Sequence, residues 1–156
     1  MSDLFELSVT RRIDAPVEKV WRIWTERLAE WWAPQPWTTE LIAFDLTAGG
    51  AFSAVMHGPD GESSAIEGVL LEVVPERRIV FTNALTAGWV PQKPFIVGIF
   101  TFAEEDGGTR YTAAARHWDE ATMQQHESMG FHEGWGAVTG QLAGLAEMPE
   151  RSAALP

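Results

Sequence analysis

Cysteine is absent from this chain of 156 residues. Its absence excludes disulfide scaffolds, thiolate zinc sites, iron–sulfur clusters and cysteine nucleophiles, and it is typical of proteins of the reducing cytoplasm. A long apolar run is also missing from the first thirty residues, where Asp3, Glu6 and Arg11 interrupt the hydrophobic positions. Because neither a signal peptide nor a membrane span fits there, we predict a cytoplasmic protein without membrane insertion.

Basic residues are scarce. Eleven Lys and Arg stand against 22 Asp and Glu, which gives a formal net charge of -11. The adjacent pairs Arg11-Arg12 and Arg77-Arg78 have no cluster of further Lys or Arg around them. A phosphate backbone is bound through clustered positive charge, so we expect no nucleic-acid partner.

Large aromatic rings are abundant, with eight Trp and eight Phe against one Tyr. Apolar residues make up 46% of the chain and charged residues 21%, which is typical of a globular domain. We therefore predict one domain over residues 1–156, with 150–156 as a frayed tail. So many rings must fill a core, line a pocket or face a partner.

Strand and helix patterns follow one another in a simple order. Residues 5–13 alternate between apolar and polar side chains, as in a half-buried strand, and Pro16 opens a helix that runs to about Glu26. A second short helical segment carries Trp31 and Trp32, and the prolines after it predict a loop around Trp37. Turn signals such as Gly58-Pro59-Asp60-Gly61 separate the strands that follow, which are expected at 39–46, 51–57, 63–74, 79–83, 95–102 and 109–118.

One long helix is expected to end the fold, from a cap at Asp119 to about Met148. Its apolar stripe includes Phe131 and Trp135, whereas its first two turns are polar and should lie at an opening. The order of elements predicts an α+β fold. In it, a curved antiparallel sheet of about six to seven strands wraps around the C-terminal helix, with two short helices after the first strand. Such an interior can enclose a cavity.

Several segments, taken in order, carry a resemblance to a known group of proteins. They are Arg11-Arg12-Ile13-Asp14-Ala15-Pro16, Trp31-Trp32-Ala33-Pro34, Asp45 to Gly50, Gly58 to Gly61, Gly68 to Arg78 and Met129 to Gly136. With them the chain resembles the START-like helix-grip (SRPBCC) superfamily and, within it, bacterial proteins similar to the C-terminal domain of the activator of heat-shock protein 90 ATPase. The resemblance implies the helix-grip fold. It leaves the function open, because the superfamily includes ligand carriers, cyclases, hydrolases and chaperone-associated domains. The eukaryotic activators also have an N-terminal domain that nothing here matches, which counts against a co-chaperone role.

The histidines near the end of the chain do not favour a metal site. His126 and His132 are six residues apart, which places them on different faces of one helix, and neither belongs to an HExxH motif. We therefore expect no metal and no cofactor. Ser63, Ser64 and Ser128 lack the strained turn that presents a nucleophilic serine.

An acid–base site is the main enzymatic alternative. If the odd positions of strand 63–74 face inward, Glu67 shares the apolar face with Val69, where a carboxylate would be desolvated as a general acid or base requires. His117 is its candidate partner in a cyclase or hydrolase type of reaction. A slip of one residue would instead expose Glu67 completely.

A ligand cavity is the leading hypothesis. Aromatic rings, small residues and flexible thioethers come from the loop, the sheet and the helix that enclose the interior, and they suit an adaptable apolar pocket. The residues expected to line it are Trp37, Phe52, Ala54, Met56, Val69, Phe100, Phe102, Trp118, Ser128, Met129, Phe131 and Trp135. We predict a carrier, sensor or sequestration protein for a small hydrophobic or aromatic molecule, with the opening near Trp37, Trp89 and the first turns of the last helix.

Two other uses of the rings stay open. Close packing, the default of small domains, would simply fill the core with them. Alternatively, exposed tryptophans near residues 31–37 and at 89 would form an interaction module that docks a chaperone or a second copy of the chain as a homodimer.

Overall fold

The computed structural model describes residues 4–149; residues 150–156, predicted to be a frayed tail, lie outside the described residues. The helices are α1 (Val17–Glu26), α2 (Glu120–Ser128) and α3 (Phe131–Glu147), and a single 3₁₀ turn covers Leu28–Glu30. The strands are β1 (Phe5–Ile13), β2 (Thr38–Phe44), β3 (Ala51–His57), β4 (Ser63–Val74), β5 (Arg78–Thr82), β6 (Leu85–Thr86), β7 (Val90–Pro91), β8 (Val97–Glu105) and β9 (Gly108–His117). Within the described part of the chain, no helix combines the length and the apolar composition needed to cross a membrane.

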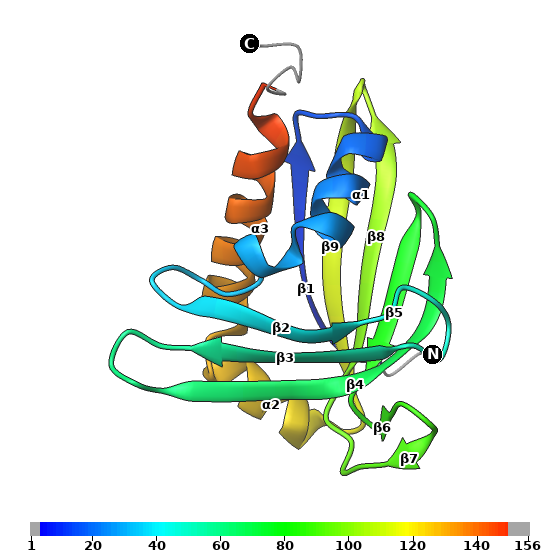
Figure 1. The fold of residues 1–156 in the computed structure, drawn as a ribbon, viewed down its shortest axis with the longest axis vertical. Coiled ribbons are helices and arrows are strands. Elements are labelled where there is room, and N and C mark those ends of the chain that lie inside the picture. Colours follow the sequence, from blue (N-terminus) through cyan, green and yellow to red (C-terminus); the bar gives the residue numbers. More distant parts are fainter. Residues whose placement is uncertain (1–3, 150–156) are drawn as a thin grey trace.

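Seven of the strands form one antiparallel sheet in the order β1-β9-β8-β5-β4-β3-β2. The sheet is strongly bent, because β2, β3 and β4 run across the direction of β1, β8 and β9 (Figure 1). Helix α1 contacts β8 and β9, and α3 contacts β1 and α1. This arrangement confirms the predicted α+β helix-grip fold.

The C-terminal helix is broken, and in this respect the expectation of one helix from Asp119 to Met148 is wrong. The Asp119 cap is present, since its Oδ1 accepts a hydrogen bond from the backbone N–H of Thr122 at 2.7 Å. Helix α2 nevertheless ends at Ser128, and Gly130 has a φ of 95°, a left-handed conformation that glycine adopts without steric cost. As a result α2 contacts β1 and β9 and lies across the end of α3 (Figure 1).

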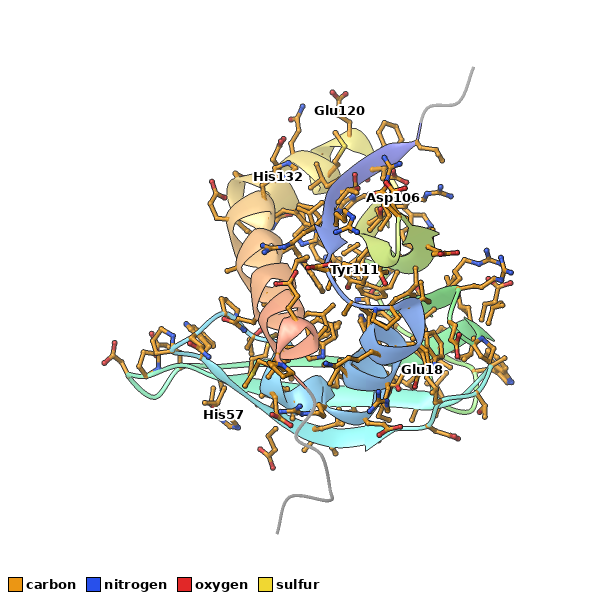
Figure 2. All side chains as sticks on the ribbon, turned by 90° about the horizontal axis from the view of Figure 1, so that it is seen from above. Glu18, His57, Asp106, Tyr111, Glu120 and His132 are labelled. Carbon is orange, nitrogen blue, oxygen red and sulfur yellow. The ribbon has the colours of Figure 1, made fainter. Side chains whose placement is uncertain are left out.

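Aromatic side chains fill the interior beneath α1. Trp24 and Tyr111 are fully buried, and the Trp24 indole N–H donates a hydrogen bond to the Tyr111 hydroxyl oxygen at 3.1 Å. Figure 2 shows Tyr111 in the middle of the molecule, between α1 and α3. Burial raises the pKa of Tyr111 far above its usual value, so the hydroxyl stays neutral. This end of the interior is a closely packed aromatic core.

We expect the substitution of glycine by alanine to have opposite effects at two positions. A Cβ at Gly68 on β4 would collide with the Thr82 carbonyl oxygen and the Phe81 ring. Gly68→Ala should therefore lower the free energy of unfolding by about 2 kcal/mol. A Cβ at Gly136 on α3 would meet nothing within 4 Å. Gly136→Ala should therefore raise the free energy of unfolding by about 0.8 kcal/mol through helix propensity. Urea unfolding measures both changes, and effects of the same sign would contradict this packing of β4 against β5.

Candidate functional site

A cavity of about 640 Å³ lies between β3 and β4, the segment before β8, and the junction of α2 and α3. Most of the side chains around it are apolar, and the polar ones are few. Its lining consists of Trp32, Pro34, Met56, Ser64, Ala65, Ile66, Glu67, Asn83, Gln92, Lys93, Phe95, Ile96, His126, Met129, Gly130, Phe131, Gly134, Trp135 and Val138. The site is therefore a hydrophobic pocket with polar groups at selected points.

The inner wall of the cavity is aromatic. Trp32 lies with its ring centroid 5.2 Å from that of Phe52 in the core and 5.2 Å from that of Trp135 on α3. A further hollow of about 30 Å³ continues inward behind Trp32 and Trp135 and reaches Phe100 on β8. Gly98, which has no side-chain carbon, and the small side chains of residues 113–115 border this hollow and leave it unfilled.

Helix α3 supplies the second wall through one of its faces. Phe131, Gly134, Trp135 and Val138 follow the spacing of three and four residues that places side chains on the same side of a helix. A Cβ built on Gly134 would meet nothing within 4 Å. The helix thus leaves open space at this position instead of filling it.

The opening is lined by polar and flexible side chains. Ser64, Glu67, Gln92 and Lys93 are exposed, as is the thioether of Met129. The chain between β7 and β8 is fastened here by Asn83, whose Oδ1 accepts hydrogen bonds from the backbone N–H groups of Phe95 and Ile96 at 2.9 and 3.0 Å. These hydrogen bonds hold the segment before β8, which forms one side of the opening, against the end of β5.

His126 of α2 lines the cavity and is hydrogen-bonded to His117 at the end of β9. His117 is buried, with its Nδ1 2.7 Å from the Phe5 carbonyl oxygen and its Nε2 2.8 Å from Nδ1 of His126. The His126 ring is half-buried in the lining, with its centroid 4.8 Å from that of Phe95 and 5.1 Å from that of Phe131. Within residues 4–149, no group of three His, Asp or Glu side chains is placed to hold a metal ion.

The structure brings only part of the expected ligand-binding set to the cavity. Met56, Met129, Phe131 and Trp135 line it, and Phe100 lines the inner hollow. The other expected residues lie elsewhere. Phe52, Ala54 and Phe102 pack in the core, Val69 is buried apart from that cluster, Trp37 is half-buried outside the lining, and Trp118 and Ser128 are exposed.

The inward orientation of Glu67, on which the acid–base alternative depended, is wrong, because the residue is exposed. Ile66 and Gly68 pair with the buried residues Ala54 and Phe52, so the even positions in this part of β4 face the core. The cause is a bulge between Leu70 and Glu72, which reverses the alternation that the later residues of the strand predict. Glu67 is exposed at the rim, where its backbone carbonyl accepts a hydrogen bond from Gln92 Nε2 at 3.0 Å.

The expected pairing of Glu67 with His117 is also not what the structure shows. Both ring nitrogens of His117 are engaged, one by Phe5 and the other by His126. His117 therefore acts on the cavity only through His126. Helical periodicity gave no sign of His126 as a lining residue, because in one continuous helix it would lie on a different face from Phe131. The break at Gly130 brings the two rings to 5.1 Å between centroids.

The expected exposure of tryptophans near residues 31–37 is wrong for two of them. Trp31 and Trp32 are buried in the core, whereas Trp89 on the turn between β6 and β7 is exposed, as expected. Trp31 follows Trp24 by seven residues, a spacing that places both on one side of a helix and could have indicated a shared interior position.

The chain is similar to a known protein family and to several solved structures. The family model described as Activator of Hsp90 ATPase homolog 1-like protein matches residues 14–147. Protein NE0264 from Nitrosomonas europaea is 38% identical, and the match covers 90% of this chain and 92% of that chain with a TM-score of 0.85. Protein Ms6760 from Mycobacterium smegmatis is 27% identical over 96% of this chain and 99% of that chain, with a TM-score of 0.79. The AHSA1 protein from Silicibacter pomeroyi, 21% identical over 90% of this chain and 96% of that chain, shares the fold with a TM-score of 0.68. No curated protein matches this chain.

We expect His126 to stay neutral in the folded protein until the solution is distinctly acidic. Burial of the ring, and after it the neighbouring His117, lowers the pKa of His126 from 6.5 to about 4. The unfolded chain binds the extra proton near pH 6.5, so stability from this group is fully present above that value and is lost as the pH falls toward 4. The loss should be about 1 kcal/mol, a figure reduced for the half-exposed ring.

Proton NMR of the imidazole ring measures this midpoint. The same residue in concentrated urea gives the unfolded reference within one sample series. A midpoint near 6.5 in the folded protein would show that the His126 ring is solvated and would contradict its placement between Phe95 and Phe131.

Proposed function

The chain belongs to the family of activator of Hsp90 ATPase homolog 1-like proteins, and we propose that it binds a small, largely apolar or aromatic molecule in the cavity between the bent sheet and the C-terminal helices. Such binding suits a carrier, a sensor or a protein that sequesters its ligand. The lack of cysteine supports a cytoplasmic location for this activity.

The size and lining of the cavity carry the proposal. Its volume of about 640 Å³ falls within the range of small-molecule sites, which are concave and mostly apolar with a few placed polar groups. Burying apolar surface of a ligand there releases water from both surfaces and supplies the main driving force for binding. Charged side chains of the lining, Glu67 and Lys93, are exposed and leave the interior free for an uncharged molecule.

The distribution of rigid and flexible groups supports ligands of more than one shape. Trp32 and Trp135 form an inner wall in which the rings contact one another, and the lining also includes the thioethers of Met56, which packs against the core, and Met129, which is exposed. A thioether side chain has several rotatable bonds and adapts to irregular surfaces. We therefore expect the inner wall to set the position of an aromatic ring and the methionines to adjust to the remainder of the ligand.

Blocking the cavity from Gly134 should weaken binding without harming the fold. Gly134→Leu places a side chain in the empty space beside Trp135, where an added Cβ meets nothing within 4 Å. The overlap with a bound molecule should weaken the binding of N-phenyl-1-naphthylamine, an uncharged fluorescent probe, by about tenfold or more. Fluorescence titration of the purified variants measures the dissociation constant.

Gly144→Leu is the matched control. Gly144 is exposed on the same helix, an added Cβ there also meets nothing within 4 Å, and it lies outside the cavity lining. Both substitutions should raise helix propensity by a similar amount, so melting temperatures of the two variants should agree. Equal probe affinities for Gly134→Leu, Gly144→Leu and the unchanged protein, or no probe binding at all, would refute the proposal.

A further inference from the structure

One polar group lies among the aromatic residues of the cavity. His126 is half-buried against Phe95 and Phe131, while the polar side chains Ser64, Glu67, Gln92 and Lys93 are exposed at the rim. Asn83 is also half-buried; its Oδ1 is occupied by two backbone N–H groups, and its amide nitrogen can only donate. Among these half-buried polar side chains, His126 is therefore the one that can offer an acceptor to a molecule held within the aromatic part of the cavity.

The protonation of His126 follows from a chain of hydrogen bonds that begins at the backbone. The carbonyl oxygen of Phe5 can only accept, so the 2.7 Å contact requires a proton on Nδ1 of His117. In neutral His117 the other nitrogen, Nε2, then carries a lone pair. For this form of His117, the 2.8 Å contact between Nε2 and Nδ1 of His126 places the shared proton on the His126 nitrogen.

These hydrogen-bond directions determine the protonation of the remaining nitrogen of His126, Nε2. A neutral imidazole has one N–H, and in His126 that N–H points to His117. Nε2 therefore carries a lone pair and acts as an acceptor only. Adding a second proton would create a cation beside the buried His117, which the apolar surroundings disfavour.

We propose that the cavity selects ligands that carry a hydroxyl group, above all phenol-like aromatic molecules, and that the hydroxyl donates its hydrogen bond to Nε2 of His126. This inference rests on the proposed function, because it specifies the chemistry of the molecule bound there. An ionised carboxylate or phenolate would place its own lone pairs against that of Nε2, so the neutral donor is the preferred form. His117 is a positioning residue that holds His126 in the accepting state.

A pair of ligands that differ in one group tests this selection. 2-Naphthol and 2-methylnaphthalene have the same ring system and nearly the same volume, but only 2-naphthol has a donor. In a purely apolar cavity the methyl compound binds more tightly, because burying a hydroxyl without a partner costs free energy. With the His126 acceptor we expect 2-naphthol to bind about tenfold more tightly than 2-methylnaphthalene, as measured by isothermal titration calorimetry.

His126→Phe removes the acceptor and keeps a ring of similar size, so the preference should reverse in favour of 2-methylnaphthalene. His132→Phe is the matched control, since His132 is an exposed histidine of α3 that contacts Glu127 outside the cavity lining. This control should keep the preference of the unchanged protein. Nitrogen-15 NMR of the imidazoles in the unchanged protein provides a test that needs no variant, and it should show Nε2 of His126 without a proton.

The outcomes separate the two proposals. Equal affinities, or a preference of the unchanged protein for 2-methylnaphthalene, would overturn the selection for a donor and leave apolar binding intact. If neither compound binds, both the selection for a donor and the proposed binding of apolar molecules are overturned. A proton on Nε2 of His126 in the ligand-free protein would overturn the selection even if His126→Phe failed to fold.

Discussion

The contacts of Trp32 divide the interior into a filled part and a hollow part. Its ring lies 6.2 Å from that of Trp24 and 5.2 Å from that of Phe52 on one side, and 5.2 Å from that of Trp135 on the other, measured between centroids. Because aromatic rings that meet edge to face lock one another in place, this wall does not need a ligand to hold its shape. The cavity can remain open while the core beside it is closely packed.

The two parts depend on different residues, which separates stability from function. Beneath α1 the indole N–H of the buried Trp24 is satisfied by the hydroxyl oxygen of the buried Tyr111, and the aromatic rings around them pack closely. Beside α3 the glycine at position 134 and the alanines at 113–115 border the cavity or its inner hollow, where larger residues would bury more apolar surface. Larger side chains at these positions would fill the space and stabilise the fold. Because the chain leaves this apolar surface uncovered, a ligand that covers it gains the corresponding free energy of burial.

The sequence predicted the framework of the fold because its signals are local. Alternation in residues 5–13, the turn at Gly58 to Gly61 and the cap at Asp119 each act within a few residues, and the elements they indicate are present. The candidate site depends on features that local patterns do not carry. The bulge near Leu71 reversed the orientation of Glu67, and the left-handed Gly130 divided a helix whose stripe appeared continuous. The bulge changes the face on which the side chains before it lie, and the break at Gly130 changes the direction of the helix that precedes it.

The contact between His117 and His126 could not be predicted from local sequence patterns either. His117 ends β9 and His126 lies within α2, so their contact arises because the helix folds back over the strand it follows. Spacing along the chain argued against a shared metal, but it held no information about a hydrogen bond between the two rings. The direction of that bond is set by a carbonyl group of β1, more than a hundred residues away in the sequence. The polarity of the cavity is therefore a property of the folded sheet, where an acceptor on the backbone determines which kind of group a side chain can offer to a ligand.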